Sequence, residues 1–177
     1  VRLLGESAAM QESFSSLGFG LGLAVVLVYL AMVTQFRSFM DPFVVMFSVP
    51  PAFTGVLVML WMTHTTLNVQ SLLGTIMVIG LTVSSSVLIV DFANQRIDQG
   101  ASPFDAVVEA SIIRLRPILM TAVAAIMGLV PTALHAGEAN TPLARAVIGG
   151  LIVSTVVKMY LLPILYSYVK RTGEPTP

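Results

Sequence analysis

The chain has 177 residues, of which 56% are hydrophobic and only 10% are charged, and its nine basic residues balance nine acidic ones. Soluble domains usually carry about a quarter charged residues, so the charged share of this chain is less than half the usual one. Together with a mean hydropathy of +0.90, this composition indicates a membrane protein. This composition argues against a soluble enzyme domain, a disordered chain and a nucleic-acid-binding protein. The sequence contains no cysteine, which excludes a disulfide framework, a thiol nucleophile and a zinc–thiolate site.

Largely uncharged stretches long enough to cross a bilayer occur five times, since one crossing needs about 20 mostly apolar residues. The predicted spans cover residues 17–36, 42–62, 69–92, 117–134 and 143–169. Residues 1–16 are a mixed lead-in segment, and residues 170–177 are a polar tail that we expect to be disordered. Because the chain begins with Val, we expect a fragment of a longer protein. The expected fold is an all-α membrane domain.

Basic residues divide unevenly between the two sides that five crossings define. One side has only Arg2 and Arg145, and the other collects Arg37, Arg96, Arg114, Arg116, Lys170 and Arg171. Lys and Arg close to membrane spans are retained in the cytoplasm. We therefore expect a multi-pass membrane protein with a cytoplasmic C-terminus and a periplasmic N-terminal segment.

The polar connection before the fourth span carries its own helix signal. Ser102 is a suitable N-cap, Pro103 suits the first helical position, and Asp105 follows three residues after the cap. Apolar residues then recur at helical spacing. The sequence predicts a short amphipathic helix at about residues 102–114 on the cytoplasmic membrane surface.

Small residues spaced four apart on one helix face predict close packing of the spans. The pairs are Gly18 with Gly22, Gly80 with Ser84, Ala124 with Gly128, and Gly150 with Ser154. We interpret these positions as ordinary packing sites in a tight bundle. The glycines assigned to packing are Gly18, Gly22, Gly80, Gly128, Gly149 and Gly150.

Lys158 is the charged residue nearest the middle of a predicted span. A lysine at the centre of a membrane helix costs about 2.5–3.5 kcal/mol and usually faces the bundle interior. Lys158 is therefore a candidate ion relay or counter-ion to an acidic group, and the alternative is a residue that snorkels or lies neutral in a protein-lined cavity. Thr155 stands one turn earlier on the same face.

The third span carries a hydroxyl cluster that includes Ser84 and Ser85, and such hydroxyls either bridge helices or bond back to their own helix. Asp91 follows near the cytoplasmic end, within reach of water or Arg96. We interpret Asp91, Arg96, Arg114 and Arg116 as cytoplasmic anchors. His64 and His135 lack the spacing of metal ligands, and no cofactor loop or catalytic motif is present.

Five segments of the chain carry a family resemblance: Ile79–Asn94, Arg114–Thr121, Leu30–Phe39 with Pro42, Pro142–Gly150 and Leu162–Tyr166. Together they resemble resistance-nodulation-division (RND) efflux transporters. The resemblance covers nearly the whole chain and implies the last five of twelve membrane helices of such a pump. It also implies an inner-membrane homotrimer that exchanges protons for exported drugs, metals or other compounds.

The implied partners are the N-terminal half and periplasmic domains of the same pump, a periplasmic adaptor, an outer-membrane channel and the lipid bilayer. One departure bears on the mechanism. Many drug pumps of the family carry a Lys followed by an Asn where this chain has Ser84 and Ser85. Our hypothesis is that Lys158 takes over the charge-compensating role, with Thr155 and Ser84 holding the surrounding hydrogen-bond geometry.

Alternatives to a proton-driven export pump remain open. A relative that moves lipids or metals, or assists protein export, shares the helical layout. A truncated product without transport of its own would act at most as a scaffold, and its unpaired small-residue faces would aggregate or bind an added partner half. An enzyme fits least, because no nucleophile, metal-ligand set or cofactor-binding loop is present.

Overall fold

The computed structural model describes residues 2–135 and 139–173, which form six α-helices joined by short turns. Five helical stretches are long and apolar enough to span a membrane, which confirms the predicted number of crossings. The helices are α1 (Arg2–Phe36), α2 (Met40–Met46), α3 (Val49–Met62), α4 (Val69–Asp98), α5 (Pro103–Leu134) and α6 (Thr141–Gly173). No strand occurs in the described ranges.

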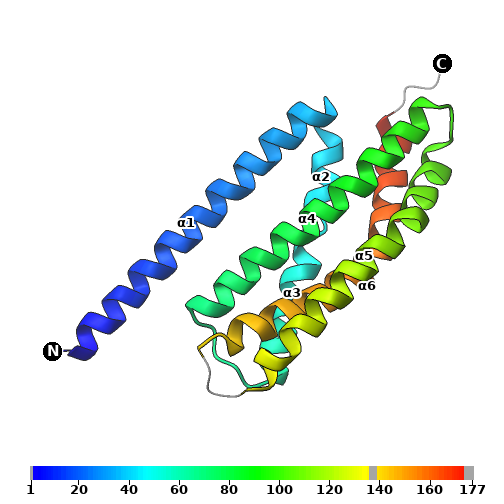
Figure 1. The fold of residues 1–177 in the computed structure, drawn as a ribbon. Coiled ribbons are helices and arrows are strands. Elements are labelled where there is room, and N and C mark those ends of the chain that lie inside the picture. The colour runs from blue at the N-terminus through cyan, green and yellow to red at the C-terminus, as the bar shows by residue number, and fades with distance from the viewer. Residues whose placement is uncertain (1, 136–138, 174–177) are drawn as a thin grey trace.

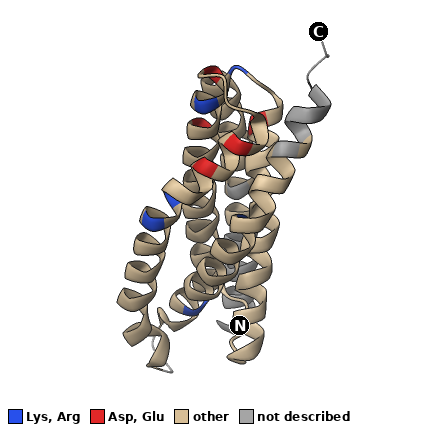
Figure 2. Ribbon diagram, turned by 90° about the vertical axis from the view of Figure 1, so that its right-hand side faces the viewer, with Lys and Arg blue, Asp and Glu red and all other residues tan. Residues whose placement is uncertain are grey.

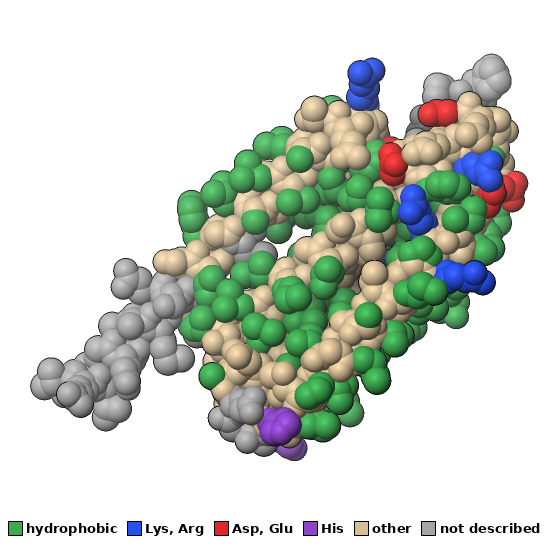
Figure 3. Space-filling view, in the orientation of Figure 1, with side chains coloured by type: hydrophobic (Ala, Val, Ile, Leu, Met, Phe, Trp, Pro, Cys, Tyr) green, Lys and Arg blue, Asp and Glu red, His purple; other side chains and the backbone are tan. Residues whose placement is uncertain are grey.

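Helices α3 to α6 pack into one bundle, in which α6 contacts α3, α4 and α5 (Figure 1). Helix α1 leans away from this bundle and joins it mainly near its own C-terminal end, where α2 begins. Hydrophobic side chains cover much of the visible surface (Figure 3). Such a surface suits helices whose outer faces contact lipid or further protein.

The second predicted span is divided into two helices. Helix α2 ends at Met46, and α3 starts at Val49 with Pro50 in its first turn. Proline has no backbone N–H, and the first turn of a helix is where that donor has no partner inside the helix. The Ser48 hydroxyl bonds back to the Val45 carbonyl oxygen at 2.6 Å, so the break is closed by local hydrogen bonds.

Helix α5 corrects the prediction of a separate surface helix. The predicted start is present, since Ser102 accepts a hydrogen bond from the Asp105 backbone N–H at 3.2 Å and Pro103 follows the cap. The helix then continues through Pro117 to Leu134 without a break. Ala106 and Ala110 are fully buried, so packing against the bundle holds this segment in line with the fourth span. Membrane helices tolerate an internal proline more readily than soluble ones.

The predicted segment boundaries also differ at both ends of the chain. The predicted lead-in segment is helical from Arg2, because α1 extends well beyond its predicted start at residue 17. The predicted polar tail begins at residue 170, whereas α6 continues to Gly173. Residues 174–177 lie outside the described ranges.

Candidate functional site

Lys158 lies inside the bundle formed by α4, α5 and α6. Its side chain is only 5% exposed, and its Nζ donates a hydrogen bond to the Ser85 Oγ of α4 at 2.5 Å. The Ser85 hydroxyl is oriented by its own helix, because it lies within hydrogen-bond distance of the carbonyl oxygens of Leu81 and Thr82. The lysine charge is therefore met by a hydroxyl oxygen whose proton points back to the backbone of α4.

Hydroxyl groups surround this contact in a cavity of about 80 Å³ between α4, α5 and α6. We call it the hydroxyl cavity, and its polar lining residues are Thr82, Ser85, Thr121, Thr155 and Lys158. Thr155 is buried, so the structure brings the predicted pair Thr155 and Lys158 to one cavity. Ser154 faces α4 instead and accepts a hydrogen bond from the Thr82 hydroxyl at 3.2 Å.

Ser84 does not reach Lys158. It is exposed on a different face of α4 and lines an apolar cavity of about 460 Å³ between α1 and α4. The hollow beside α1 is visible in Figure 3. Successive helix residues differ in direction by about 100°, which separates Ser84 from Ser85. The hypothesis that Ser84 holds the geometry around Lys158 is therefore corrected: Ser85 makes the contact.

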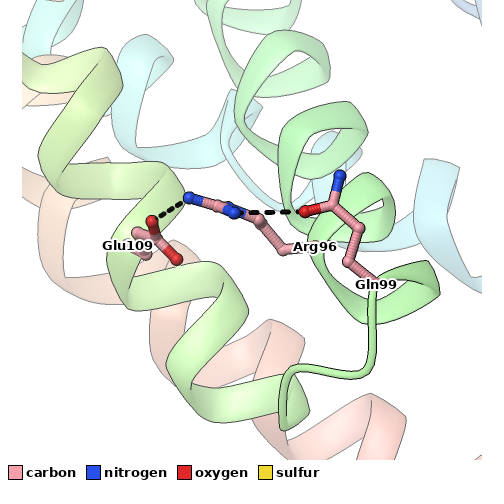
Figure 4. A network of polar contacts seen from close by, with 3 residues as sticks. All are labelled: Arg96, Gln99 and Glu109. Atoms are coloured by element: carbon pink, nitrogen blue, oxygen red, sulfur yellow. Dashed lines mark hydrogen bonds and ion pairs between the residues drawn. The ribbon is translucent and has the colours of Figure 1, made fainter.

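Charged side chains gather at the end of the bundle where α4 ends and α5 begins (Figure 2), which we call the charged end. Arg96 pairs with Glu109 of α5 and donates to the Gln99 side chain at 3.1 Å (Figure 4). Asp91 accepts a hydrogen bond from the Gln95 side chain at 3.0 Å. The predicted option of an Asp91–Arg96 contact is thus replaced by pairing of Arg96 with α5.

Two of the predicted anchors flank one aromatic ring. The guanidinium carbons of Arg96 and Arg114 lie 5.6 and 5.8 Å from the centre of the Phe92 ring. Such cation–π contacts stabilise the pair when water is partly excluded. Arg116 is exposed on α5 nearby. Membrane anchoring by these residues remains a prediction.

The sequence analysis missed a buried polar network that joins α2, α4 and α6. Asp41 is only 2% exposed and accepts a hydrogen bond from the Asn94 side chain at 2.8 Å. Asn94 in turn accepts one from the Tyr166 hydroxyl at 2.5 Å. An acid directly before Pro42 at the start of an apolar stretch was the available signal. Its partner could not be predicted, because Asn94 lies 53 residues after Asp41 and Tyr166 lies 72 residues after Asn94.

At the opposite end of the bundle, Arg145 connects three elements. It donates to the Thr65 hydroxyl at 2.8 Å, to the Thr63 carbonyl at 3.4 Å and to the Ala133 carbonyl at 3.1 Å. His135 contacts the Pro131 carbonyl oxygen through Nδ1 at 2.6 Å. In the described ranges, no group of three or more His, Cys, Asp or Glu residues could hold a metal ion.

The predicted packing glycines fall into two groups. A Cβ added at Gly149 would lie 2.1 Å from the Met59 Cβ, and one at Gly150 would lie 2.6 Å from a Val78 methyl group, so both mark close helix contacts. Open space surrounds the remaining four: Gly18, Gly22, Gly80 and Gly128. Their packing role remains a prediction that needs protein outside these helices. Gly55 and Gly74 also pack closely against α6, and the sequence analysis missed them.

A profile described as the AcrB/AcrD/AcrF family matches residues 1–170. The Swarming motility protein SwrC of Bacillus subtilis (strain 168) is 34% identical over 98% of this chain and 17% of its own length. An uncharacterized transporter of Haemophilus influenzae (strain ATCC 51907 / DSM 11121 / KW20 / Rd) is 32% identical over 97% of this chain and 18% of its own length.

The fold also matches a solved structure. The crystal structure of a heavy metal efflux pump superimposes with a TM-score of 0.82 and 32% identity, over 93% of this chain and 16% of the pump. The chain thus spans less than a fifth of each of these three relatives. The match over nearly all of the sequence, together with five membrane-length helices, shows that this multi-pass membrane chain belongs to the AcrB/AcrD/AcrF family of RND transporters.

Proposed function

We propose that this chain is the last membrane portion of a proton-driven RND pump that exports drugs or other toxic compounds, and that Lys158 supplies the positive charge of its proton-coupling site. The observation that carries the proposal is the burial of Lys158 beside Ser85. A membrane-interior charge is costly and typically marks an ion or proton pathway. The contact that the Lys158 ammonium makes with a described side chain is the Ser85 hydroxyl, which carries no charge, so we propose that an acid outside these helices balances it.

The rest of the same pump is the proposed source of that acid. The relatives are more than five times longer than this chain, which leaves ample protein to cover α1, the α1–α4 cavity and the open glycine positions. Resemblance to the family extends the proposal to a homotrimer with a periplasmic adaptor and an outer-membrane channel. More basic residues lie on the side of the charged end than on the opposite side of the five spans, which supports a cytoplasmic location for the charged end, in the bacterial inner membrane.

Lys158→Met in the native polypeptide tests the coupling role. It keeps an unbranched side chain but removes the charge, so we expect export to be abolished while trimer assembly is preserved. Val156→Met is the matched control, because Val156 is 56% exposed on the same helix. Undiminished export by Lys158→Met would refute the role.

Adjacent serines provide a second, sharper test. Ser85→Ala removes the acceptor that lies 2.5 Å from Lys158, whereas Ser84→Ala alters only the lining of the α1–α4 cavity. We expect export to fall in Ser85→Ala and to stay near the parent value in Ser84→Ala. Equal effects of the two changes would contradict a site built on the Lys158–Ser85 contact.

Export of metal ions is the second candidate function. It is favoured by the 32% identical heavy metal efflux pump. Growth of a pump-deficient host expressing the native polypeptide, on a panel of toxic metal salts and a panel of drugs, separates the two. Protection against metals alone would favour the second candidate, and protection against drugs alone would favour the first.

The mass of the native polypeptide tests the alternative that this chain is a truncated product without transport of its own. Intact-mass analysis of the native polypeptide extracted from its source membrane should give several times 18.9 kDa if these helices belong to a full pump. A mass close to 18.9 kDa would assign the pump function to the relatives and not to this chain.

A further inference from the structure

Helices α4 and α6 run side by side through the bundle in the same direction (Figure 1). Close contacts between them recur every four residues on both helices, and we call this line of contacts the α4–α6 seam. Its three levels pair Gly74 with Ala146, Val78 with Gly150, and Thr82 with Ser154. Each level joins residues that are 72 positions apart in the chain, so the two helices keep one register along the seam.

The contact between Lys158 and Ser85 is the next level of the seam. Ser85 comes three residues after Thr82, and Lys158 comes four residues after Ser154, so the new level lies about one helical turn further along both helices. Side chains of a helix tilt toward its N-terminus, which lets the long lysine lean back to Ser85. Sliding of α6 by one turn, about 5.4 Å, would carry the ammonium away from this hydroxyl. The contact therefore depends on the register.

The level directly before Lys158 is held by a hydrogen bond between the two helices. The Thr82 hydroxyl donates to the Ser154 hydroxyl at 3.2 Å, and both side chains are only 1% exposed. The two earlier levels are close packing contacts at glycines, which have no preferred direction. A hydrogen bond is directional, and a buried hydroxyl that loses its partner is costly. Thr82 and Ser154 therefore favour one register of α4 against α6.

We propose that Thr82 and Ser154 are positioning residues, which hold α4 and α6 in the register that brings the Lys158 ammonium to the Ser85 hydroxyl. Neither positioning residue is hydrogen-bonded to the lysine in the described part of the chain: Thr82 donates to Ser154, and Ser154 lies within reach of the Leu151 carbonyl oxygen of its own helix. Their effect on export rests on the proposed coupling role of Lys158. Their effect on the register does not.

The reactivity of a thiol at position 85 measures the contact with the lysine. Ser85→Cys is made in the native polypeptide, with any cysteines outside this cysteine-free sequence replaced. The probe is methyl methanethiosulfonate, which is small, uncharged and able to enter membranes. A neighbouring ammonium group stabilises the thiolate, which is the reactive form, so we expect Ser85→Cys to react about tenfold faster than the same variant with Lys158→Met added.

Thr82→Val removes the hydroxyl donor and keeps the branched shape of the side chain, and Thr75→Val is the matched control. Thr75 is also buried on α4, but its hydroxyl bonds to the Ser71 carbonyl oxygen of its own helix at 2.7 Å. Adding Thr82→Val should slow the reaction of Ser85→Cys about threefold to tenfold, whereas adding Thr75→Val should leave it unchanged. Thr82→Ser retains a hydroxyl and should keep most of the parent rate.

Ser154→Ala removes the acceptor of the same hydrogen bond from the other helix. It should slow the reaction of Ser85→Cys as much as Thr82→Val does. The two changes together should slow it no further than either alone, because both break one contact. In the parent background, which keeps Ser85, export should fall in Thr82→Val and recover in Thr82→Ser.

Equal reaction rates after Thr82→Val and Thr75→Val would overturn the positioning role. A rate that does not change on adding Lys158→Met would overturn it as well, because position 85 would not lie beside the lysine. The outcome is separable from the proposed function. Slower reaction in Thr82→Val, combined with normal export by Lys158→Met, would keep the positioning role and reject the coupling role. Loss of export by Lys158→Met, with an unchanged reaction rate in Thr82→Val, would do the reverse.

Discussion

Gly149→Ala should weaken the contact between α3 and α6. A Cβ at this position would lie 2.1 Å from the Met59 Cβ and 2.6 Å from the Gly55 carbonyl oxygen. Carbon atoms make their best contacts at about 3.5–4.0 Å, so the new methyl group would be at least about 1.4 Å too close to Met59. Neither obstacle is the flexible end of a side chain, so the two helices must separate.

The expected size follows from two opposing effects. Overpacking typically costs about 1–3 kcal/mol, and rigid neighbours place this site at the upper end. Replacing glycine by alanine inside a helix returns up to about 1 kcal/mol through helix propensity. The net loss is about 1–2 kcal/mol in the free energy of unfolding, which is roughly a 5–30-fold change in the folded-to-unfolded ratio.

Unfolding of the purified 177-residue chain in mild detergent, driven by SDS and followed by circular dichroism, measures this loss. Gly128→Ala is the matched control, since nothing lies within 4 Å of the added Cβ there, and it should be neutral or slightly stabilising. If Gly149→Ala unfolded at the same SDS fraction as Gly128→Ala, the close approach of α3 and α6 would be wrong.

Three further changes probe the polar contacts. Tyr166→Phe removes the hydroxyl that donates to Asn94 and should lower the free energy of unfolding by about 1–3 kcal/mol in the same titration; an unchanged midpoint would contradict the network. Arg145→Met removes the donor to Thr65 and should accelerate hydrogen exchange in that loop, whereas unchanged protection would show that the arginine does not hold it. Asn68→Ala removes the cap of α4 at a cost of about 0.5–2 kcal/mol, and Asn68→Ser, which retains a capping oxygen, should recover most of it.

Hydropathy and local signals identified the helices because each depends on nearby residues. Largely uncharged stretches predicted five membrane-length helices, and Ser102 with Pro103 predicted where α5 begins. The same signals failed where packing decides continuity. Buried Ala106 and Ala110 align the expected surface helix with the fourth span into one helix, and the division between α2 and α3 was not expected.

The sequence by itself determined that the chain has five stretches long and apolar enough to cross a membrane, that it resembles RND transporters, and that a lysine lies within its last span. Only the tertiary structure decided that Lys158 meets Ser85 and not Ser84, and that Asp41 meets Asn94. The physical reason is that spacing along a helix fixes the angle between two of its side chains. It does not fix which of the two side chains faces another helix, because that depends on how all the helices pack together.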